Sequence, residues 1–151
     1  MGNPLPITVN IFNKKKPTRI SDEAITGPTK AESFVRENMT PYLEDSMQEV
    51  FLVLGMDAGN KPTLFEALGL GTVDRAAVYP REVVRRLLEC GCTSVIVAHN
   101  HPSGRLEASQ ADIDLTRHLK MACDLFEISL LDHFLITDKG MIKIDWKGGE
   151  W

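Results

Sequence analysis

The chain has 151 residues, of which 43% are hydrophobic and 25% are charged, and its formal net charge is −4. This length predicts a single domain with its own core and excludes an eight-stranded βα barrel, and no apolar run reaches the ~18–20 residues of a bilayer span. The acidic balance argues against a duplex-binding domain, whose affinity comes largely from basic residues that contact phosphates.

We assign residues 1–28 to an N-terminal arm and residues 29–151 to the domain that follows it. The arm holds an alternating stretch over residues 7–12 and three consecutive lysines at 14–16. We interpret the lysines as a solvated run rather than as a nucleic-acid contact, because short charge runs usually face water.

Hydrophobic spacing and turn residues divide the rest of the chain into eight elements. In chain order we predict a helix over Thr29–Leu43 that stops near Pro41, strands over Met47–Met56 and Pro62–Gly71, a helix from Pro80 to about Gly91, a strand over Thr93–Ala98, a helix capped by Ser109, and strands over Glu127–Ile136 and Met141–Asp145. The expected buried stripes of the second and third helices include Leu88, Leu125 and Phe126. The order α-β-β-α-β-α-β-β predicts an α/β fold, in which helices cover a mixed sheet.

The segment from His99 to Asp112 carries the chemistry. His99 and His101 lie two residues apart, and side chains at this spacing in extended backbone point the same way, so both imidazoles can reach one metal ion. Asp112 falls at the third position of the helix capped by Ser109, where its carboxylate either caps the helix or faces a cation. Two imidazoles, one carboxylate and an open position form the ligand set of a catalytic zinc, which lowers the pKa of a bound water towards ~7.

These residues also have structural interpretations. Asp112 alone fits a carboxylate stabilised by the helix dipole, and His118 lies on a polar helix face, where we expect it to be solvated. Glu49 is the candidate general base, since strand alternation puts it on the same face as Phe51 and Val53. Burial on that face would raise the pKa of its carboxyl, although the same periodicity fits an exposed first residue of the strand.

Other motifs narrow the choice of function. The sequence lacks the His-x-Glu and Pro-Cys-x-x-Cys pair of cytidine deaminases, the His-Glu-x-x-His motif, and the glycine-rich loops that bind nucleotides. Cys90 and Cys92 have no nearby second pair for a zinc knuckle. Together with Cys123 they make three cysteines, a small and odd number that favours a reducing compartment over a disulfide framework. We therefore expect a cytoplasmic protein, and we expect no signal peptide.

The run His99-Asn100-His101-Pro102, followed by Ser109 and Asp112, resembles the His-x-His-Pro…Ser-x-x-Asp signature of the JAMM (MPN) zinc metalloproteases. The chain resembles the RadC family more closely than it resembles the JAMM proteases as a whole. The RadC proteins are bacterial and are named for DNA repair. The similarity extends over about Thr29 to Ile144. The stretches that carry it are residues 71–74 (Gly-Thr-Val-Asp), 78–82 (Val-Tyr-Pro-Arg-Glu), 99–104 and 131–133 (Leu-Asp-His).

This resemblance implies an αβα sandwich around a curved sheet, related to the fold of cytidine deaminases. It also implies that His99, His101 and Asp112 are zinc ligands and that Glu49 is the general base for a bound water. The resemblance gives Ser109 a hydrogen bond to the tetrahedral oxyanion, in addition to its role as a helix cap.

Asp132 and His133 match the RadC pattern as well, and we assign no role to Asp132. His133 either supports the site from a neighbouring strand or packs in the sheet, and we favour packing. The chain departs from the family where Ala108 replaces a proline and Arg105-Leu106-Glu107 replaces Asp-Pro-Thr, so substrate preference is expected to differ there. Residues 1–28 are too short for the helix-hairpin-helix of many relatives, which weakens a role in binding DNA.

The leading hypothesis is a zinc-dependent hydrolase of peptide or isopeptide bonds, acting on an unidentified peptide or protein, with no membrane partner. The first alternative is a non-catalytic, nucleic-acid-associated module in DNA repair, against which the net charge of −4 argues. The second alternative is a metal-stabilised scaffold of the kind that JAMM-like domains form when they lose their glutamate. We rank it lower because Glu49 is present.

Overall fold

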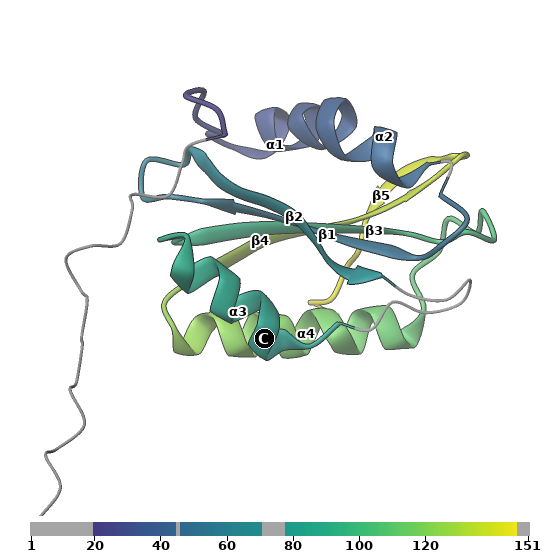
Figure 1. Ribbon diagram of the computed structural model, residues 1–151. Coiled ribbons are helices and arrows are strands. Elements are labelled where there is room, and N and C mark those ends of the chain that lie inside the picture. The colour runs from purple at the N-terminus through teal and green to yellow at the C-terminus, as the bar shows by residue number, and fades with distance from the viewer. Residues whose placement is uncertain (1–19, 45, 71–77, 148–151) are drawn as a thin grey trace, which may run out of the picture.

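The computed structural model describes residues 20–44, 46–70 and 78–147, and in this part of the chain a five-stranded sheet lies between two layers of helices (Figure 1). The helical elements are α1 (Pro28–Phe34), the π-helical η1 (Val35–Met39), α2 (Thr40–Leu43), α3 (Pro80–Glu89) and α4 (Gln110–Leu125). The strands are β1 (Val50–Met56), β2 (Pro62–Leu70), β3 (Ser94–Asn100), β4 (Ser129–Thr137) and β5 (Gly140–Lys143). The predicted α/β sandwich and the order of its elements are confirmed.

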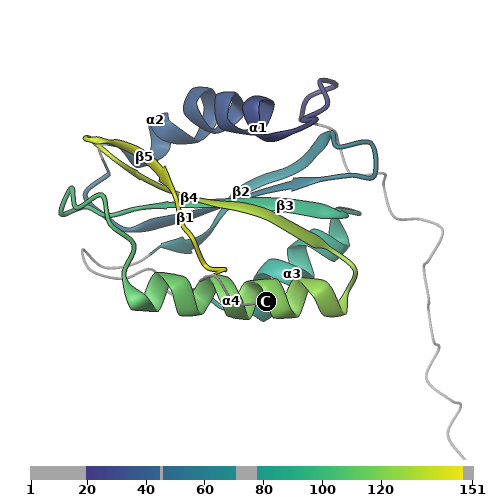
Figure 2. The same cartoon turned by 180° about the vertical axis from the view of Figure 1, so that it is seen from behind.

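The sheet has the strand order β2-β1-β3-β4-β5, in which β3 and β4 are parallel and the other neighbours are antiparallel. The segment α1–η1–α2 covers one face, and α3 and α4 cover the other, as the two opposite views show (Figures 1 and 2). All seven residues of the central strand β3 are buried, as expected for a strand that is covered on both faces. None of the described helices is both long and apolar enough to cross a membrane.

Alternation along the strands sends side chains into two separate cores. The core on the α1 side takes Leu52 and Leu54 of β1 and Ile96 and Ala98 of β3. The core on the α3/α4 side takes the residues between them, namely Phe51, Val53, Val95 and Val97. His99 continues the second series, so its imidazole lies on the α3/α4 side at the carboxyl end of β3.

The register of β4 against β3 shifts by one residue at Leu131. Leu130, just before the shift, packs in the core on the α3/α4 side, whereas Phe134 packs in the core on the α1 side. Simple alternation from Leu130 would place Phe134 on the α3/α4 side, because positions four apart share a face. The shift instead leaves that side to His133.

The first helical segment and the first strand differ from their predicted bounds. The helix continues to Leu43, so the expected stop near Pro41 is wrong. In η1 the backbone bonds widen, with the Thr40 N–H donating to the Val35 carbonyl, and Pro41 then falls in the first turn of α2, where no N–H is needed. Strand β1 begins at Val50 rather than at Met47.

Three apolar side chains that were expected to be buried are exposed: Leu88 (46%), Leu125 (83%) and Phe126 (53%). Leu88 closes the last turn of α3, and the other two end α4. The buried stripes of these helices are narrower than predicted and end at Leu87 and Cys123, both fully buried.

The described part of the predicted arm packs on the domain. Ile25 is buried in the core on the α1 side, and its N–H donates to the Asn60 carbonyl at 2.8 Å. The core therefore begins before residue 29. The alternating stretch at 7–12, the lysines at 14–16 and the motif at 71–74 lie outside the described residues.

Candidate metal centre

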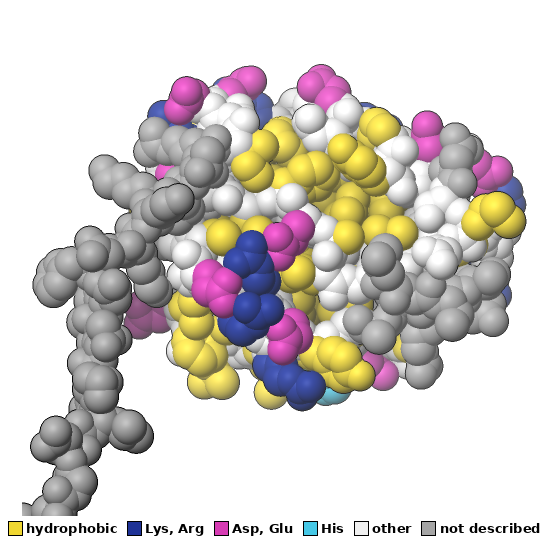
Figure 3. Space-filling view, in the orientation of Figure 1, with side chains coloured by type: hydrophobic (Ala, Val, Ile, Leu, Met, Phe, Trp, Pro, Cys, Tyr) yellow, Lys and Arg dark blue, Asp and Glu magenta, His cyan; other side chains and the backbone are white. Residues whose placement is uncertain are grey.

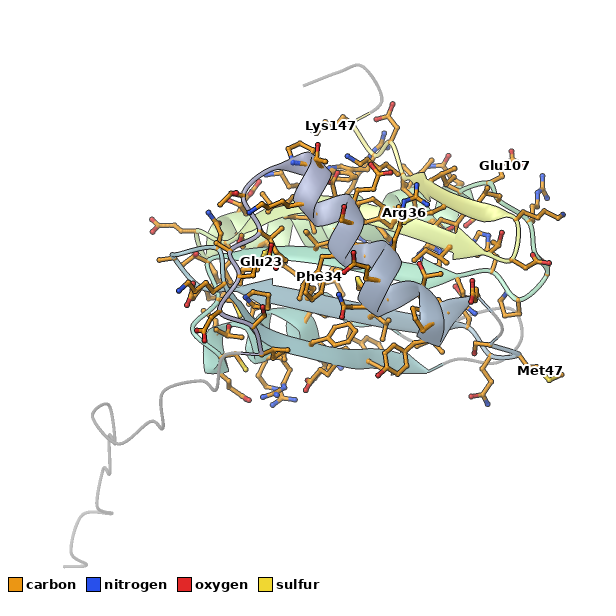
Figure 4. The ribbon with its side chains drawn as sticks, turned by 90° about the horizontal axis from the view of Figure 1, so that it is seen from above. Glu23, Phe34, Arg36, Met47, Glu107 and Lys147 are labelled. Atoms are coloured by element: carbon orange, nitrogen blue, oxygen red, sulfur yellow. The ribbon has the colours of Figure 1, made fainter. Side chains whose placement is uncertain are left out.

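Four side chains converge where β3 ends and α4 begins. Glu49 directly precedes β1, His99 is the second-last residue of β3, His101 follows β3, and Asp112 is the third residue of α4. One ligand atom from each lies within 4.8 Å of the others, so the group could hold a metal ion. In the view from above, the labelled Met47 and Glu107 mark the loops that lead into β1 and α4, and both lie at this end of the sheet (Figure 4).

The carboxylate of Asp112 contacts both histidines. Its Oδ1 lies 3.1 Å from His99 Nε2 and its Oδ2 lies 3.0 Å from His101 Nε2. The two Nε2 atoms are 3.2 Å apart. The structure therefore brings the three residues predicted as ligands into mutual contact, from a strand, a loop and a helix.

Asp112 caps α4 at the same time. Ser109 Oγ accepts a hydrogen bond from the Asp112 N–H at 3.1 Å, and Asp112 Oδ2 accepts one from the Ser109 N–H at 2.8 Å, which is a capping box. Helix cap and cation ligand, which the sequence left as alternatives for Asp112, are compatible roles of one carboxylate. Burial opposes ionisation of Asp112, but the neighbouring His101 and His99 rings, which donate to the carboxylate when they carry a proton on Nε2, outweigh burial and hold the pKa of this carboxyl well below its usual range.

The backbone of the following loop fixes the orientation of His101. Its Nδ1 lies 3.0 Å from the carbonyl oxygen of Arg105, and a carbonyl only accepts, so Nδ1 carries a proton and, in the neutral ring, Nε2 presents a lone pair. Gly104 has a φ of +77°, which favours glycine and lets the loop turn back over His101. The hydrogen bond to Asp112 raises the pKa of His101 against the opposing effect of burial.

A buried chain of hydrogen bonds fixes His99 in the same way. Thr116 Oγ1 donates to the Asp112 carbonyl at 2.6 Å, so its single proton is used, and its contact of 2.6 Å with His133 Nδ1 requires Nδ1–H on His133. Burial lowers the pKa of His133 well below its usual value, which keeps the ring neutral and makes Nε2 an acceptor. His99 Nδ1, 2.7 Å away, then donates to that Nε2.

The favoured interpretation of His133, that it only packs in the sheet, is therefore wrong, and the alternative, that His133 supports the site from a neighbouring strand, agrees with its contact with His99. His133 joins β4 to the candidate site, and Thr116 was missed altogether. The sequence pattern did not reveal the register shift at Leu131, and it is this shift that turns His133 towards α4. A threonine four residues after Asp112 on the same helix is a local clue, because its hydroxyl can reach that carbonyl.

With their Nδ1 atoms used as donors, His99 and His101 both turn Nε2 towards one another and towards the Asp112 carboxylate. When both rings are neutral these are two lone pairs 3.2 Å apart, which repel, and a cation between them and Asp112 removes the repulsion. A proton on His101 Nε2 has the same effect because it donates to Asp112, and this hydrogen bond raises the pKa of His101. Neutral imidazoles and one carboxylate fit a divalent transition metal such as zinc.

Glu49 is buried, at 8% exposure, rather than an exposed first residue of the strand. Asn100 holds the backbone on both sides of it. Its Oδ1 accepts from the Val50 N–H at 2.7 Å, and its Nδ2 donates to the Gln48 carbonyl at 2.9 Å. A buried amide between the two histidines thus positions the loop that carries Glu49, a function that sequence analysis did not assign.

A cleft of about 340 Å³ opens beside His101. Its lining residues come from the loops around the candidate site: Glu44, Ser46, Met47, Pro102, Ser103, Gly104 and Asp138. In the same loop as Gly104, the exposed Arg105 guanidinium bonds Glu107 at 2.8 and 3.0 Å, which ties together two of the four residues that depart from the family pattern. The cleft gives an approach from solvent to His101.

Three other titratable groups lie apart from the site. His118 is exposed, as predicted. Asp132 Oδ2 lies 3.8 Å from Lys143 Nζ, and burial raises the pKa of its carboxyl. Cys90 is a free thiol, as are the other two cysteines, and no further group of metal-ligating side chains occurs among the described residues.

Comparison with known proteins bears on the resemblance noted above. The sequence model of the RadC-like JAB domain matches residues 25–148. A UPF0758 protein of Marinomonas sp. (strain MWYL1) is 48% identical over 104 residues, which cover 69% of this chain and 46% of that protein. A UPF0758 protein of Marinobacter nauticus is 43% identical over 132 residues, which cover 86% of this chain and 59% of that protein.

A UPF0758 protein of Acidithiobacillus ferrooxidans (strain ATCC 53993) is 44% identical over 115 residues, which cover 76% of this chain and 51% of that protein. The chain thus spans about half the length of the curated relatives that it matches. The match of the JAB domain model covers the four converging side chains and every described helix and strand. The chain therefore belongs to the RadC family, through the family's JAB domain.

Proposed function

We propose that this domain is a zinc-dependent hydrolase of amide bonds, with a peptide or isopeptide as its substrate. The observation that carries the proposal is the convergence of His99 Nε2, His101 Nε2 and the Asp112 carboxylate, with Glu49 as a fourth group within 4.8 Å. Three ligands leave a position for water and substrate, which distinguishes a catalytic from a closed structural zinc site. A carboxylate beside that position supplies the general base that hydrolysis needs.

His99, His101 and Asp112 would hold the metal. A zinc ion bound there supplies Lewis-acid polarisation of the substrate carbonyl and lowers the pKa of water towards ~7. Because Asp112 is fixed by the capping box and each histidine by its Nδ1 hydrogen bond, the ligand atoms are oriented before any metal binds. Such preorganisation favours a defined coordination geometry.

Glu49 would accept a proton from the attacking water and deliver it to the nitrogen of the leaving amine. The buried position of the carboxylate, with its backbone held by Asn100, suits a group that moves a proton over a short distance. Ser109 Oγ accepts the helix-capping hydrogen bond from Asp112, so its own hydroxyl proton is available for the oxyanion that forms during attack.

A segment of substrate would reach the centre through the cleft beside His101. Apart from Met47 and Pro102, the residues that line the cleft are polar, charged or glycine, which fits the polar backbone of an extended chain better than a compact apolar molecule. Met47, 84% exposed on its rim, offers an apolar contact to such a chain.

The described surface supports hydrolysis over nucleic-acid binding. Arg85 and Arg86 form the basic cluster of α3, but Arg85 bonds Glu82 and Glu89 and Arg86 bonds Glu66 and Glu89. Figure 3 shows basic and acidic side chains interleaved on the face that it presents. A cluster whose charge is cancelled in this way offers little to a phosphate backbone.

Metal analysis tests the proposal first. Protein purified without chelator is expected to contain close to one equivalent of zinc, and the His101→Ala variant is expected to lose it. His118→Ala is the matched control, because this histidine is exposed on α4 away from the centre. Wild-type protein that takes up no zinc, even on titration, would overturn the proposed function.

A second experiment separates a hydrolase from a metal-stabilised scaffold. Glu49→Gln is expected to bind zinc as the wild type does and to cleave libraries of fluorogenic peptides and lysine isopeptides roughly 10²–10⁴-fold more slowly. Equal cleavage by wild type and Glu49→Gln would remove Glu49 from the mechanism and favour the scaffold.

A further inference from the structure

We infer that His133 and Thr116 are positioning residues that select the metal-binding tautomer of His99. The inference deepens the proposed function and rests on its metal site. It concerns two residues outside the predicted ligand set, one on β4 and one on α4, which contact the predicted ligands rather than the metal position itself.

His99, His133 and Thr116 are isolated from solvent. His99 is 2% exposed, and His133 and Thr116 are both 0% exposed. Water cannot substitute for a missing hydrogen-bond partner at such positions without a cavity to hold it. The protonation of each ring nitrogen is therefore set by its protein neighbour.

The donors and acceptors in this series of hydrogen bonds are fixed at Thr116, the residue farthest from the metal position. A backbone carbonyl cannot donate, so the Thr116 hydroxyl donates its one proton to the Asp112 carbonyl and accepts a hydrogen bond from His133 Nδ1. A neutral imidazole protonated on Nδ1 has its lone pair on Nε2, which faces His99 Nδ1 at 2.7 Å. Each step permits one assignment, which ends with the proton of His99 on Nδ1.

This assignment decides whether His99 can bind a metal. A metal ligand needs a lone pair, and Nε2 is the nitrogen of His99 that faces Asp112 and His101. If the acceptor on Nδ1 is lost, the proton of His99 can move to Nε2 and block the ligand position. The hydrogen bonds also join two ligands, because the Thr116 hydroxyl bonds the backbone of Asp112.

The test uses zinc itself as the probe, in competition with a chromophoric chelator, so that no substrate is required. His133→Leu introduces an apolar side chain of similar size and removes the acceptor. We expect its zinc affinity to fall roughly 10–100-fold, as it does when other hydrogen-bond partners of metal ligands are lost. His133→Gln supplies an amide oxygen at a reach close to that of Nε2 and is expected to recover most of the loss. His118→Leu, an exposed histidine on α4, is the control.

Thr116 provides a second pair of variants. Thr116→Val preserves shape but removes the hydroxyl and is expected to weaken zinc binding less than His133→Leu, since His133 can still face His99. Thr116→Ser keeps the hydroxyl and is expected to match the wild type. This pair keeps the inference testable if His133→Leu fails to fold in circular dichroism of the zinc-free protein.

Long-range ¹H–¹⁵N spectra of the imidazoles give a readout that a merely structural role would not change. In the zinc-free wild type above pH 7.5, His99 and His133 are both expected to be protonated on Nδ1. In His133→Leu, the signal of His99 is expected to shift towards the tautomer protonated on Nε2, while His133→Gln retains the wild-type pattern.

The outcomes are distinct from those of the proposed function. Absence of zinc from the wild type overturns the metal site and the inference with it. If the wild type binds zinc and His133→Leu stays within twofold of His118→Leu, the metal site stands and the inference is overturned. A loss in His133→Leu that His133→Gln does not restore also overturns it, because the role of an acceptor is then excluded.

Discussion

The cores on the two faces of the sheet differ in polarity, although the same strands contribute to both. The core on the α1 side is apolar, with Leu54, Ile96 and Phe134 fully buried at its centre. The core on the α3/α4 side is apolar beneath α3 but turns polar where α4 begins, at His99 and His133. The apolar core tolerates small losses one at a time, whereas in the polar region each group depends on a specific partner.

The largest expected effect is a loss of stability caused by a substitution in the apolar core on the α1 side. Leu54→Ala removes a fully buried side chain from the α1 side and is expected to lower the free energy of unfolding by about 2–5 kcal/mol. Zinc affinity is expected to stay within twofold, because the change lies across the sheet from the metal centre. Denaturant unfolding in chelator and zinc competition measure the two quantities separately.

A tenfold change in the zinc affinity of Leu54→Ala would show that the two faces are not independent. Met121→Ala is its control for both measurements, since Met121 is an exposed residue of α4.

A smaller effect is expected at the polar end of β3, where Asn100 holds the Glu49 loop. Asn100→Ala leaves the Val50 N–H and the Gln48 carbonyl without their side-chain partner and is expected to cost about 1–3 kcal/mol of stability. Asn100→Asp keeps an acceptor for Val50 but turns a buried carboxylate oxygen towards the Gln48 carbonyl, so it is expected to lose at least as much. Hydrogen exchange of the Val50 amide reports the local opening directly.

Both Asn100 variants are expected to bind zinc, since their histidines keep the Nδ1 partners. If Asn100→Ala is as stable as the wild type and its Val50 amide exchanges no faster, Asn100 does not hold the loop. Asn38→Ala is a suitable control, because the amide of Asn38 bonds a carbonyl within its own helical segment.

The smallest effect concerns the apolar part of the α3/α4 side, where burial raises the pKa of both Cys92 and Cys123 to about 11. A thiol reacts as its thiolate, so at pH 8 both are expected to resist iodoacetamide in the folded protein. Half-buried Cys90 is expected to react first. Mass spectrometry of native and unfolded samples measures the order, and equal labelling of all three thiols in the native sample would contradict it.

Local patterns in the sequence predict most of the fold and the candidate ligands. The order of elements follows from periodicity and turn residues, and His99, His101 and Asp112 stand close together in the chain around one strand–loop–helix turn. Contacts of this kind need no knowledge of strand pairing. The same holds for Ser109, whose capping role is set by residues three positions apart.

The rest depends on contacts between distant parts of the chain. The burial of Glu49 follows from Asn100, fifty residues away from Val50, whose amide it binds. The roles of His133 and Thr116 follow from how β4 and α4 pack on β3, which hydrophobic alternation does not encode. The helical segment continues through Pro41 because the π-helical turn η1 precedes it, and a hydrophobic periodicity of 3.6 residues cannot predict such a turn.

The register shift at Leu131 constrains how this region can vary. Leu131 is the extra residue of the shift, so a deletion of Leu131 would leave Leu130 and His133 two positions apart, and regular alternation would keep His133 on the α3/α4 side. Loss of the shift at unchanged length would instead turn Phe134 towards the candidate ligands and His133 into the layer beneath α1. The way β4 pairs with β3 therefore decides which side chain reaches His99, even when every residue of the site is present in the sequence.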